Sequence, residues 1–184
     1  MNSIVIIGSG GHANSLIDLI ESSNKFRIKG YFDKAKNKKI KLKYLGDDTE
    51  IKKYKFKFAA IGIGLGLSPK KKMQLVKQYK NQGISFPKLI HKSSYVSRTC
   101  KIHDGAQVFA GTIINANSQI GSYTIINTGS IIEHDCFVGE NSFICPGSIV
   151  LGSCKIGKNT IIGSRNVILP NTNILSNTFI KAKI

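Results

Sequence analysis

A histidine between two acidic residues, Glu133-His134-Asp135, has the residue types of a proton-transfer site. A neutral imidazole can remove the proton from an amine or hydroxyl as that group attacks. A neighbouring carboxylate can hold the ring in the correct tautomer and stabilise the imidazolium that forms. The sequence leaves open which of the two carboxylates would do so. The isolated His91 and His103 are typical of inert surface histidines.

A glycine-rich turn, residues 8–12 (Gly-Ser-Gly-Gly-His), is the second chemical signal. Amide hydrogens at the start of a helix bind phosphate, and glycines let a ligand approach the backbone. The turn alone is a weak signal, because it lacks the third glycine of the dinucleotide fingerprint and such glycines often serve packing only.

Apolar runs and helical patterns place this turn in a small α/β domain. The predicted strands are residues 3–7, 27–32, 56–63 and 84–90, and the predicted helices are 13–22 and 69–79, the second with Ser68 as N-cap. The order βαββαβ, with turns for ligands at the strand ends, is typical of a parallel Rossmann-like sheet. We therefore expect an α/β domain over residues 1–89.

From Ile90 to Ile180 every sixth residue is isoleucine or valine, at sixteen positions without a break. The residue four positions later is small in nearly every case. A period of six excludes an amphipathic helix and a simple alternating strand. An inward β-branched residue on each flat strand and a small residue at each corner describe a triangular coil of eighteen residues. Residues 90–184 are therefore predicted to form an all-β solenoid of about five coils of parallel strands.

The glycine turn followed by this solenoid, together with segment 127–136 (Asn-Thr-Gly-Ser-Ile-Ile-Glu-His-Asp-Cys), resembles the hexapeptide-repeat sugar acyltransferases over essentially the whole chain. That family includes sialic acid O-acetyltransferases and N-acetyltransferases of nucleotide-linked 4-amino-sugars. The resemblance implies a Rossmann-like α/β domain followed by a left-handed parallel β-helix, whose hand the spacing does not give. It also implies a homotrimer that holds coenzyme A between adjacent prisms.

The resemblance assigns roles to individual residues. His134 is the implied general base, with Asp135 or Glu133 in support and Asn127 at the acceptor. The residues expected to bind the nucleotide sugar are Gly10, Gly11, His12, Asp33, Gly62 and Ile63. The residues expected to contact acetyl-CoA are Gly152, which is eighteen residues after His134, and, as weaker candidates, Gly163 and Ser164. Many members of that family follow the last coil with a short Gly-x-Pro-Ala-Lys-like tail. Residues 179–184 do not match that tail, so we expect Lys181 or Lys183 to contact the coenzyme's phosphates instead.

The expected function is acetyl transfer from acetyl-CoA to a nucleotide-activated amino-sugar, a UDP-linked 4-amino-sugar, in the synthesis of a bacterial surface glycan. An O-acetyltransferase of a sialic-acid-like sugar and a non-catalytic binding solenoid remain alternatives. A dinucleotide-dependent oxidoreductase is disfavoured, because no catalytic Tyr/Lys pair accompanies the glycine turn. A metalloenzyme of the carbonic anhydrase type needs three converging histidines, whereas those of the solenoid fall on different columns, so no metal is expected.

Composition excludes further classes of protein. The net charge is +17, and residues 1–89 carry 19 Lys/Arg against 6 Asp/Glu. The lysines are scattered through loops such as residues 34–43 without interleaved aromatics, so nucleic acid is not the expected partner. The four cysteines occupy corner positions or follow an inward isoleucine, which indicates packing in a reducing cytoplasm. No apolar run approaches eighteen residues and none resembles a signal peptide, so we expect a cytoplasmic protein without a membrane span.

Overall fold

The computed structural model describes residues 1–47 and 49–183, in two compact units, Met1–Pro87 and Lys88–Ile184. No helix in the described part of the chain has both the length and the apolar character needed to cross a bilayer.

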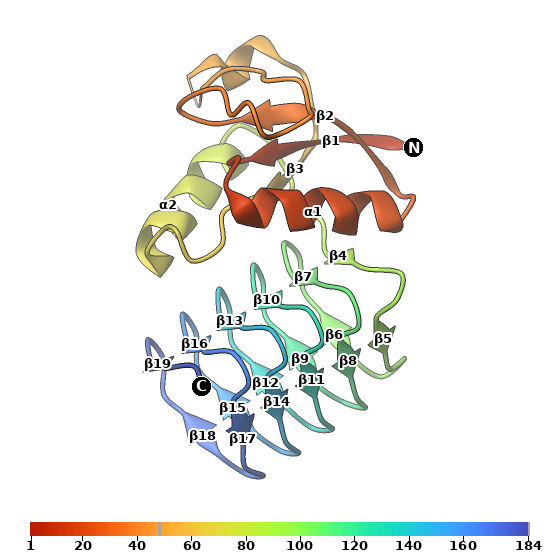
Figure 1. Cartoon of the computed structure of the whole chain (residues 1–184), viewed down its shortest axis with the longest axis vertical. Coiled ribbons are helices and arrows are strands. Elements are labelled where there is room, and N and C mark those ends of the chain that lie inside the picture. Colours follow the sequence, from red (N-terminus) through yellow and green to blue (C-terminus); the bar gives the residue numbers. More distant parts are fainter. Residues whose placement is uncertain (48, 184) are drawn as a thin grey trace. The chain divides into compact units, whose positions relative to one another are not determined.

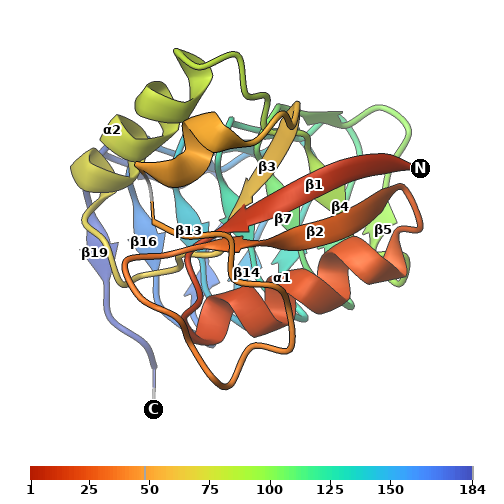
Figure 2. The ribbon, with the colours of Figure 1, turned by 90° about the horizontal axis from the view of Figure 1, so that it is seen from above.

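The first unit is built on a parallel sheet of three strands in the order β2-β1-β3, which lie side by side in Figure 2. Its elements are β1 (Asn2–Ile7), α1 (Gly11–Ser22), β2 (Phe26–Phe32), the 3-10 helix η1 (Glu50–Lys53), β3 (Phe58–Ile61) and α2 (Pro69–Lys80). The apolar residues 4–7 of the central strand β1 are buried. Ser68 caps α2 as predicted, because its hydroxyl accepts a hydrogen bond from the amide of Lys71.

The strand predicted at residues 84–90 is divided between two structures. Ser85 makes only an isolated bridge to Phe58 of β3, whereas Leu89–Ile90 is β4, the first strand of the second unit. The sheet of the first unit therefore has three strands, one fewer than the pattern βαββαβ predicts. Pro87 explains the break, since it has no N–H to continue a strand ladder.

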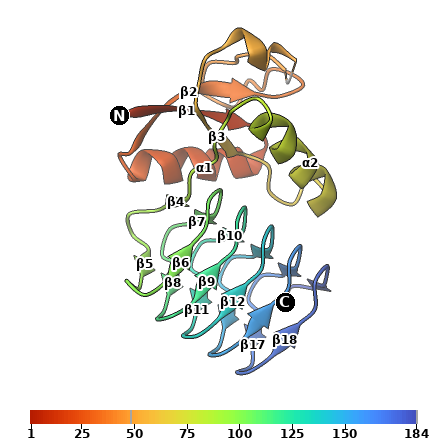
Figure 3. The same cartoon turned by 180° about the vertical axis from the view of Figure 1, so that it is seen from behind.

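The second unit is a parallel β-helix with three flat faces (Figures 1 and 3). Sheet B consists of β4, β7 (Gln107–Val108), β10 (Ile125–Ile126), β13 (Phe143–Ile144), β16 (Ile161–Ile162) and β19 (Phe179–Ile180). Sheet C consists of β5 (Tyr95–Val96), β8 (Ile113–Ile114), β11 (Ile131–Ile132), β14 (Ile149–Val150) and β17 (Val167–Ile168). Sheet D consists of β6 (Lys101–Ile102), β9 (Gln119–Ile120), β12 (Phe137–Val138), β15 (Lys155–Ile156) and β18 (Asn173–Ile174).

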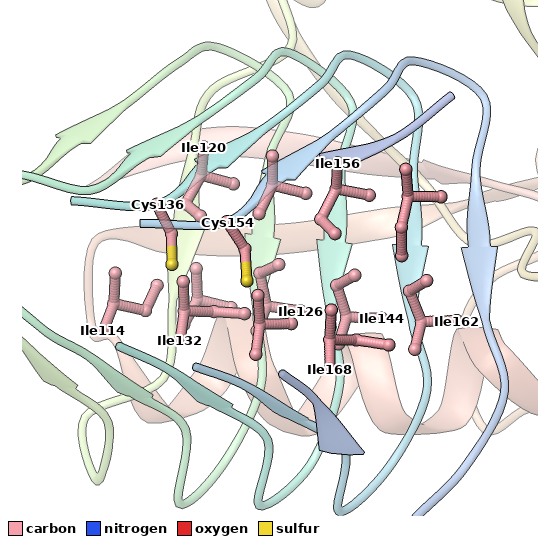
Figure 4. Packing of buried hydrophobic residues seen from close by; sticks show 14 of the residues in the cluster. Ile114, Ile120, Ile126, Ile132, Cys136, Ile144, Cys154, Ile156, Ile162 and Ile168 are labelled. Atoms are coloured by element: carbon pink, nitrogen blue, oxygen red, sulfur yellow. The ribbon is translucent and has the colours of Figure 1, made fainter. Parts of the chain in front are cut away.

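The inward residue of each strand forms the core of the β-helix, which confirms the predicted period of six. These isoleucines and valines point toward a common axis (Figure 4) and are 0% exposed from Val108 to Ile162. Residues eighteen apart pair directly, as Ile114 and Ile132 do in sheet C. Each coil is therefore one unit of eighteen residues, about five of them in all.

The small corner residues are hydrogen-bond donors as well as compact side chains. In most coils the side chain donates to the backbone carbonyl fifteen residues later, as Ser130 Oγ does to Cys145 O at 2.9 Å. Cys136 and Cys154 occupy the same position and donate their S–H groups to carbonyls at 3.2 and 3.0 Å. All four cysteines are free thiols. The corner position thus selects a donor, a requirement that the sequence pattern alone did not indicate.

Replacing the fully buried Ser142 with alanine is expected to lower the free energy of unfolding by about 1–3 kcal/mol, because buried polar groups lose their partners. Ser142 Oγ donates to Gly157 O at 2.9 Å and accepts from the amide of Thr160 at 3.1 Å. Ser142→Thr is the matched control, since Thr124 and Thr160 hold the same corner position in the adjacent coils. Denaturant titration measures both variants, and equal stability of Ser142→Ala and the wild type would contradict the role of the hydroxyl.

A third repeating position of the β-helix, after the inward residue and the small corner residue, lies three residues after each inward residue. At thirteen such positions, from Gly105 to Asn177, the backbone has a positive φ, and most of these residues are glycine or asparagine. Asp135 is one of them, with φ 56°. The backbone of this candidate site residue therefore has the corner conformation that recurs every six residues from Gly105 to Asn177.

Candidate functional site

The glycine turn after β1 borders a cavity of about 340 Å³ in the first unit. Gly10 is the N-cap of α1 and makes no side-chain cap, and the first turn of this helix has no acidic residue. A Cβ atom at Gly10 or Gly11 would meet no atom within 4 Å, so both glycines face open space. An anion can therefore reach the positive end of α1 and its amide hydrogens.

The residues expected to bind the nucleotide sugar all line this cavity, and they are Gly10, Gly11, His12, Asp33, Gly62 and Ile63. Asp33 follows β2, Gly62 and Ile63 follow β3, and the other three lie at the start of α1 just after β1. The ends of these three strands meet at one edge of the parallel sheet. Gly62 also has a packing role, because a Cβ there would lie 2.7 Å from Ile6 Cγ2 and 2.9 Å from the carbonyl of Gly8.

Asp33 holds the glycine turn in place. Its Oδ2 accepts hydrogen bonds from the amide of Ser9 at 2.8 Å and from the Ser9 hydroxyl at 2.5 Å. Its Oδ1 accepts from the amide of Lys34 at 2.7 Å. From the loop after β2, Asn37 Nδ2 donates to the carbonyl of Ser9 at 2.5 Å. Much of the hydrogen-bonding capacity of Asp33 thus serves to shape the turn.

A second cavity of the first unit, of about 370 Å³, shares Gly8, Asp33 and Ile63 with the first. One wall is a face of α2, formed by Lys71, Gln74, Leu75 and Gln78. These residues were not predicted as site residues. Their spacing of three and four residues along one predicted helix face was the available signal.

The candidate catalytic pair lies in the second unit, where His134 and Asp135 follow β11 at the corner between sheets C and D. His134 Nδ1 lies 2.8 Å from Asp135 Oδ2, and the side chains are 59% and 51% exposed. The pKa of Asp135 lies below its ordinary value. The hydrogen bond from His134 is the largest cause, and the hydrogen bond from Asn117 is the second. An ionised Asp135 fixes the proton of His134 on Nδ1 and leaves Nε2 as the acceptor. Of the two candidate carboxylates, Asp135 is the one bonded to the ring.

Gly152 lies one coil beyond His134 and contacts its ring. A Cβ atom at Gly152 would lie 2.7 Å from both Cε1 and Nε2 of His134. The imidazole therefore occupies the space that a side chain at this position would need. The absence of a side chain at Gly152 thus leaves room for the histidine, and the contact with acetyl-CoA that the family resemblance implies stays a prediction.

The remaining predicted residues lie at another corner, between sheets B and C. Asn127 follows β10 and accepts a hydrogen bond from the amide of Thr128 at 2.8 Å. Gly163 and Ser164 follow β16, and a Cβ at Gly163 would lie 2.3 Å from the amide nitrogen of Ala182. Gly163 therefore makes room for the C-terminal segment of the chain. The structure does not bring these three residues to the His134 corner of the same chain.

The histidines of the β-helix lie at three different corners. His91 follows a strand of sheet B, His103 a strand of sheet D and His134 a strand of sheet C. Within residues 1–47 and 49–183, no three side chains of His, Cys, Asp or Glu are grouped as metal ligands would be.

Two family models match parts of the chain. Residues 3–79 match the PglD N-terminal domain, and residues 135–170 match the bacterial transferase hexapeptide (six repeats). A search of curated proteins found no match.

Solved structures resemble nearly the whole chain. PerB from Caulobacter crescentus, in complex with CoA and GDP-perosamine, has a TM-score of 0.90 at 28% identity and covers 99% of this chain and 87% of its own. A histidine-to-asparagine mutant of perosamine N-acetyltransferase from the same organism, with the same two ligands, has a TM-score of 0.90 at 27% identity with the same coverage. The acetyltransferase domain of PglB from Neisseria gonorrhoeae FA1090, in complex with acetyl coenzyme A, shares the fold, with a TM-score of 0.91 at 23% identity over 99% of this chain and 89% of that one. These likenesses confirm the expected α/β domain followed by a left-handed β-helix.

Proposed function

Because this chain belongs to the hexapeptide-repeat family of sugar acyltransferases, we propose that it transfers an acetyl group from acetyl-CoA to the amino group of a nucleotide-linked sugar. The observation that carries the proposal is the His134–Asp135 hydrogen bond of 2.8 Å, which leaves Nε2 of the ring as a proton acceptor. PerB, solved with CoA and GDP-perosamine, supports the substrate class.

In the proposed reaction the amine of the sugar attacks the carbonyl carbon of the thioester. His134 Nε2 takes the proton that the amine loses as the C–N bond forms. The C–S bond then breaks, and the imidazolium returns the proton to the departing thiolate of coenzyme A. Asp135 stabilises the imidazolium and keeps Nδ1 protonated throughout.

The first unit is proposed to bind the nucleotide sugar through the two cavities beside the glycine turn. The smaller cavity, at the positive end of α1, suits a diphosphate. The larger one combines apolar walls, such as Phe32 and Leu75, with the polar Gln74 and Gln78. Such a lining suits a planar base with hydrogen-bonding edges.

A thiol-release assay with acetyl-CoA tests this function against UDP-, GDP- and TDP-linked amino-sugars. We expect release of free coenzyme A that depends on one of these acceptors. The same sugars with a hydroxyl in place of the amine separate N- from O-acetylation. Release no faster than acetyl-CoA hydrolysis with every acceptor would contradict the proposal.

Gly11→Val is expected to raise KM for the nucleotide sugar at least tenfold, which is roughly the effect of losing one charge-assisted hydrogen bond. KM for acetyl-CoA should stay nearly unchanged. The branched side chain would enter the space where the phosphate approaches α1. Steady-state kinetics with each substrate varied in turn measures both constants. Equal effects on the two constants would show that the turn serves folding only.

The active assembly is proposed to be a homotrimer that packs through sheet C. The outward residues of this sheet are all apolar and exposed or partly exposed, namely Tyr95, Ile113, Ile131, Ile149 and Val167. Sheet D carries mainly polar residues outward, with Phe137 as the exception. A continuous exposed apolar face is typical of a protein interface. A second copy on sheet C lies beside the His134 corner and the Asn127 corner, so that a coenzyme groove can form between chains.

Ile149→Asp is expected to convert the trimer to monomers and to lower activity at least tenfold, because a buried unpaired carboxylate costs several kcal/mol. Light scattering measures the mass and the thiol-release assay the activity. Phe137→Asp on sheet D is the matched control, since Phe137 is 47% exposed on a polar face. A fully active monomeric wild type would refute the trimer.

A further inference from the structure

Asn117 lies one coil before Asp135 and contacts the carboxylate oxygen that the histidine does not bond. Asn117 Nδ2 donates to Asp135 Oδ1 at 3.1 Å, while Asp135 Oδ2 is bonded to His134 Nδ1. The two oxygens of one carboxylate thus have separate partners. We propose that Asn117 is a positioning residue that fixes Asp135, and through it His134, for acetyl transfer; this inference rests on the proposed function.

The backbone of Asn117 is itself held in place by the coils around it. Its amide donates to Thr99 Oγ1, one coil earlier, at 2.9 Å. Asn117 and Asp135 share the left-handed corner conformation, with φ of 61° and 56°. The amide of Asp135 donates to the carbonyl of Ala116 at 2.9 Å. Three successive coils therefore form one connected chain from Thr99 through Asn117 and Asp135 to His134.

This contact matters because the Asp135 side chain is half exposed, so that surrounding atoms alone do not fix its rotamer. Only when one oxygen is held by Asn117 does the other face His134 Nδ1 in a single orientation. The Nδ2 group of Asn117 can only donate, so the contact also favours the ionised form of Asp135. That form keeps the proton of His134 on Nδ1, as a base acting through Nε2 requires.

Asn117→Gly and Asn117→Asp test the role without disturbing the corner, since glycine and aspartate tolerate a positive φ. We expect kcat to fall about tenfold in Asn117→Gly, as the base is partly misplaced, while KM for both substrates changes little. In Asn117→Asp a like charge faces Asp135, so the pKa of Asp135 should rise further than in Asn117→Gly. Carboxyl NMR titration measures that pKa in the wild type and both variants.

Asn171→Gly is the matched control, because Asn171 occupies the same corner position two coils beyond Asp135 with φ 58°. It should leave both kcat and the pKa of Asp135 unchanged. In an Asp135→Asn background, Asn117→Gly should cause no further loss of kcat. An unchanged pKa of Asp135 in both Asn117 variants would overturn the inference, even if kcat fell. The NMR titration needs no substrate, so it tests the role of Asn117 even if every acceptor fails in the thiol-release assay.

Discussion

His134→Ala is expected to lower kcat by about a hundredfold to ten-thousandfold, the usual loss when a positioned general base is removed. The stability of the protein should change little, because the side chain is largely exposed and stands outside the core of the β-helix. Single-turnover measurements of acetyl transfer, together with thermal unfolding, check both expectations.

His103→Ala is the control for this experiment. His103 lies at a different corner of the same β-helix, so its removal tests whether the loss is specific to the proposed base. We expect wild-type turnover for His103→Ala. A His134→Ala variant that keeps more than half of the wild-type kcat would remove His134 from the mechanism.

Gly152→Ala is expected to lower kcat by about a hundredfold, which is the loss that roughly an ångström of misplacement can cause. The new methyl group would stand 2.7 Å from His134 Nε2 and Cε1, so the ring must turn away. That movement lengthens or breaks the hydrogen bond to Asp135. The rates of Gly152→Ala and of the wild type are compared under saturating concentrations of both substrates.

The double variant His134→Ala/Gly152→Ala separates two explanations of this loss. If Gly152 acts through the histidine, the double variant should be no slower than His134→Ala alone. If the methyl group instead blocks acetyl-CoA, the two losses should multiply and KM for acetyl-CoA should rise. The second outcome would support the coenzyme contact that the family resemblance implies for Gly152.

The β-helix could be predicted almost residue by residue because each coil repeats the same physical requirement. An inward isoleucine or valine recurs every six residues, and the corner residues that follow are nearly always small. The positive-φ register was not recognised, because Tyr123, Ser153 and Arg165 interrupt its glycines and asparagines. Without that register, the choice between Glu133 and Asp135 could not be made from the sequence.

Contacts of the candidate sites were harder to predict where they depend on side-chain direction. The family resemblance implied that six residues around the glycine turn share one cleft, and the structure brings them to one cavity because strand ends of a parallel sheet converge. The sequence did not identify the wall of α2, since Gln74 and Gln78 look like ordinary surface residues of a helix. Asn117 was missed because the spacing of eighteen residues places it one coil before Asp135 but does not show that its side chain points toward that carboxylate. Pro87 indicates a break in the strand predicted at residues 84–90. The apolar residues on both sides of it favoured one continuous strand instead.

The proposed base lies in the central coil of a linear array. β11 and β12, on either side of His134, are the middle strands of sheets C and D, each of which has five strands. In such an array each coil contacts only its neighbours, so fraying starts at the ends and moves inward. Amide hydrogens around His134 should therefore exchange with solvent more slowly than those of the terminal coils. The proposed base would then lie where thermal opening of the β-helix backbone is expected to be rarest.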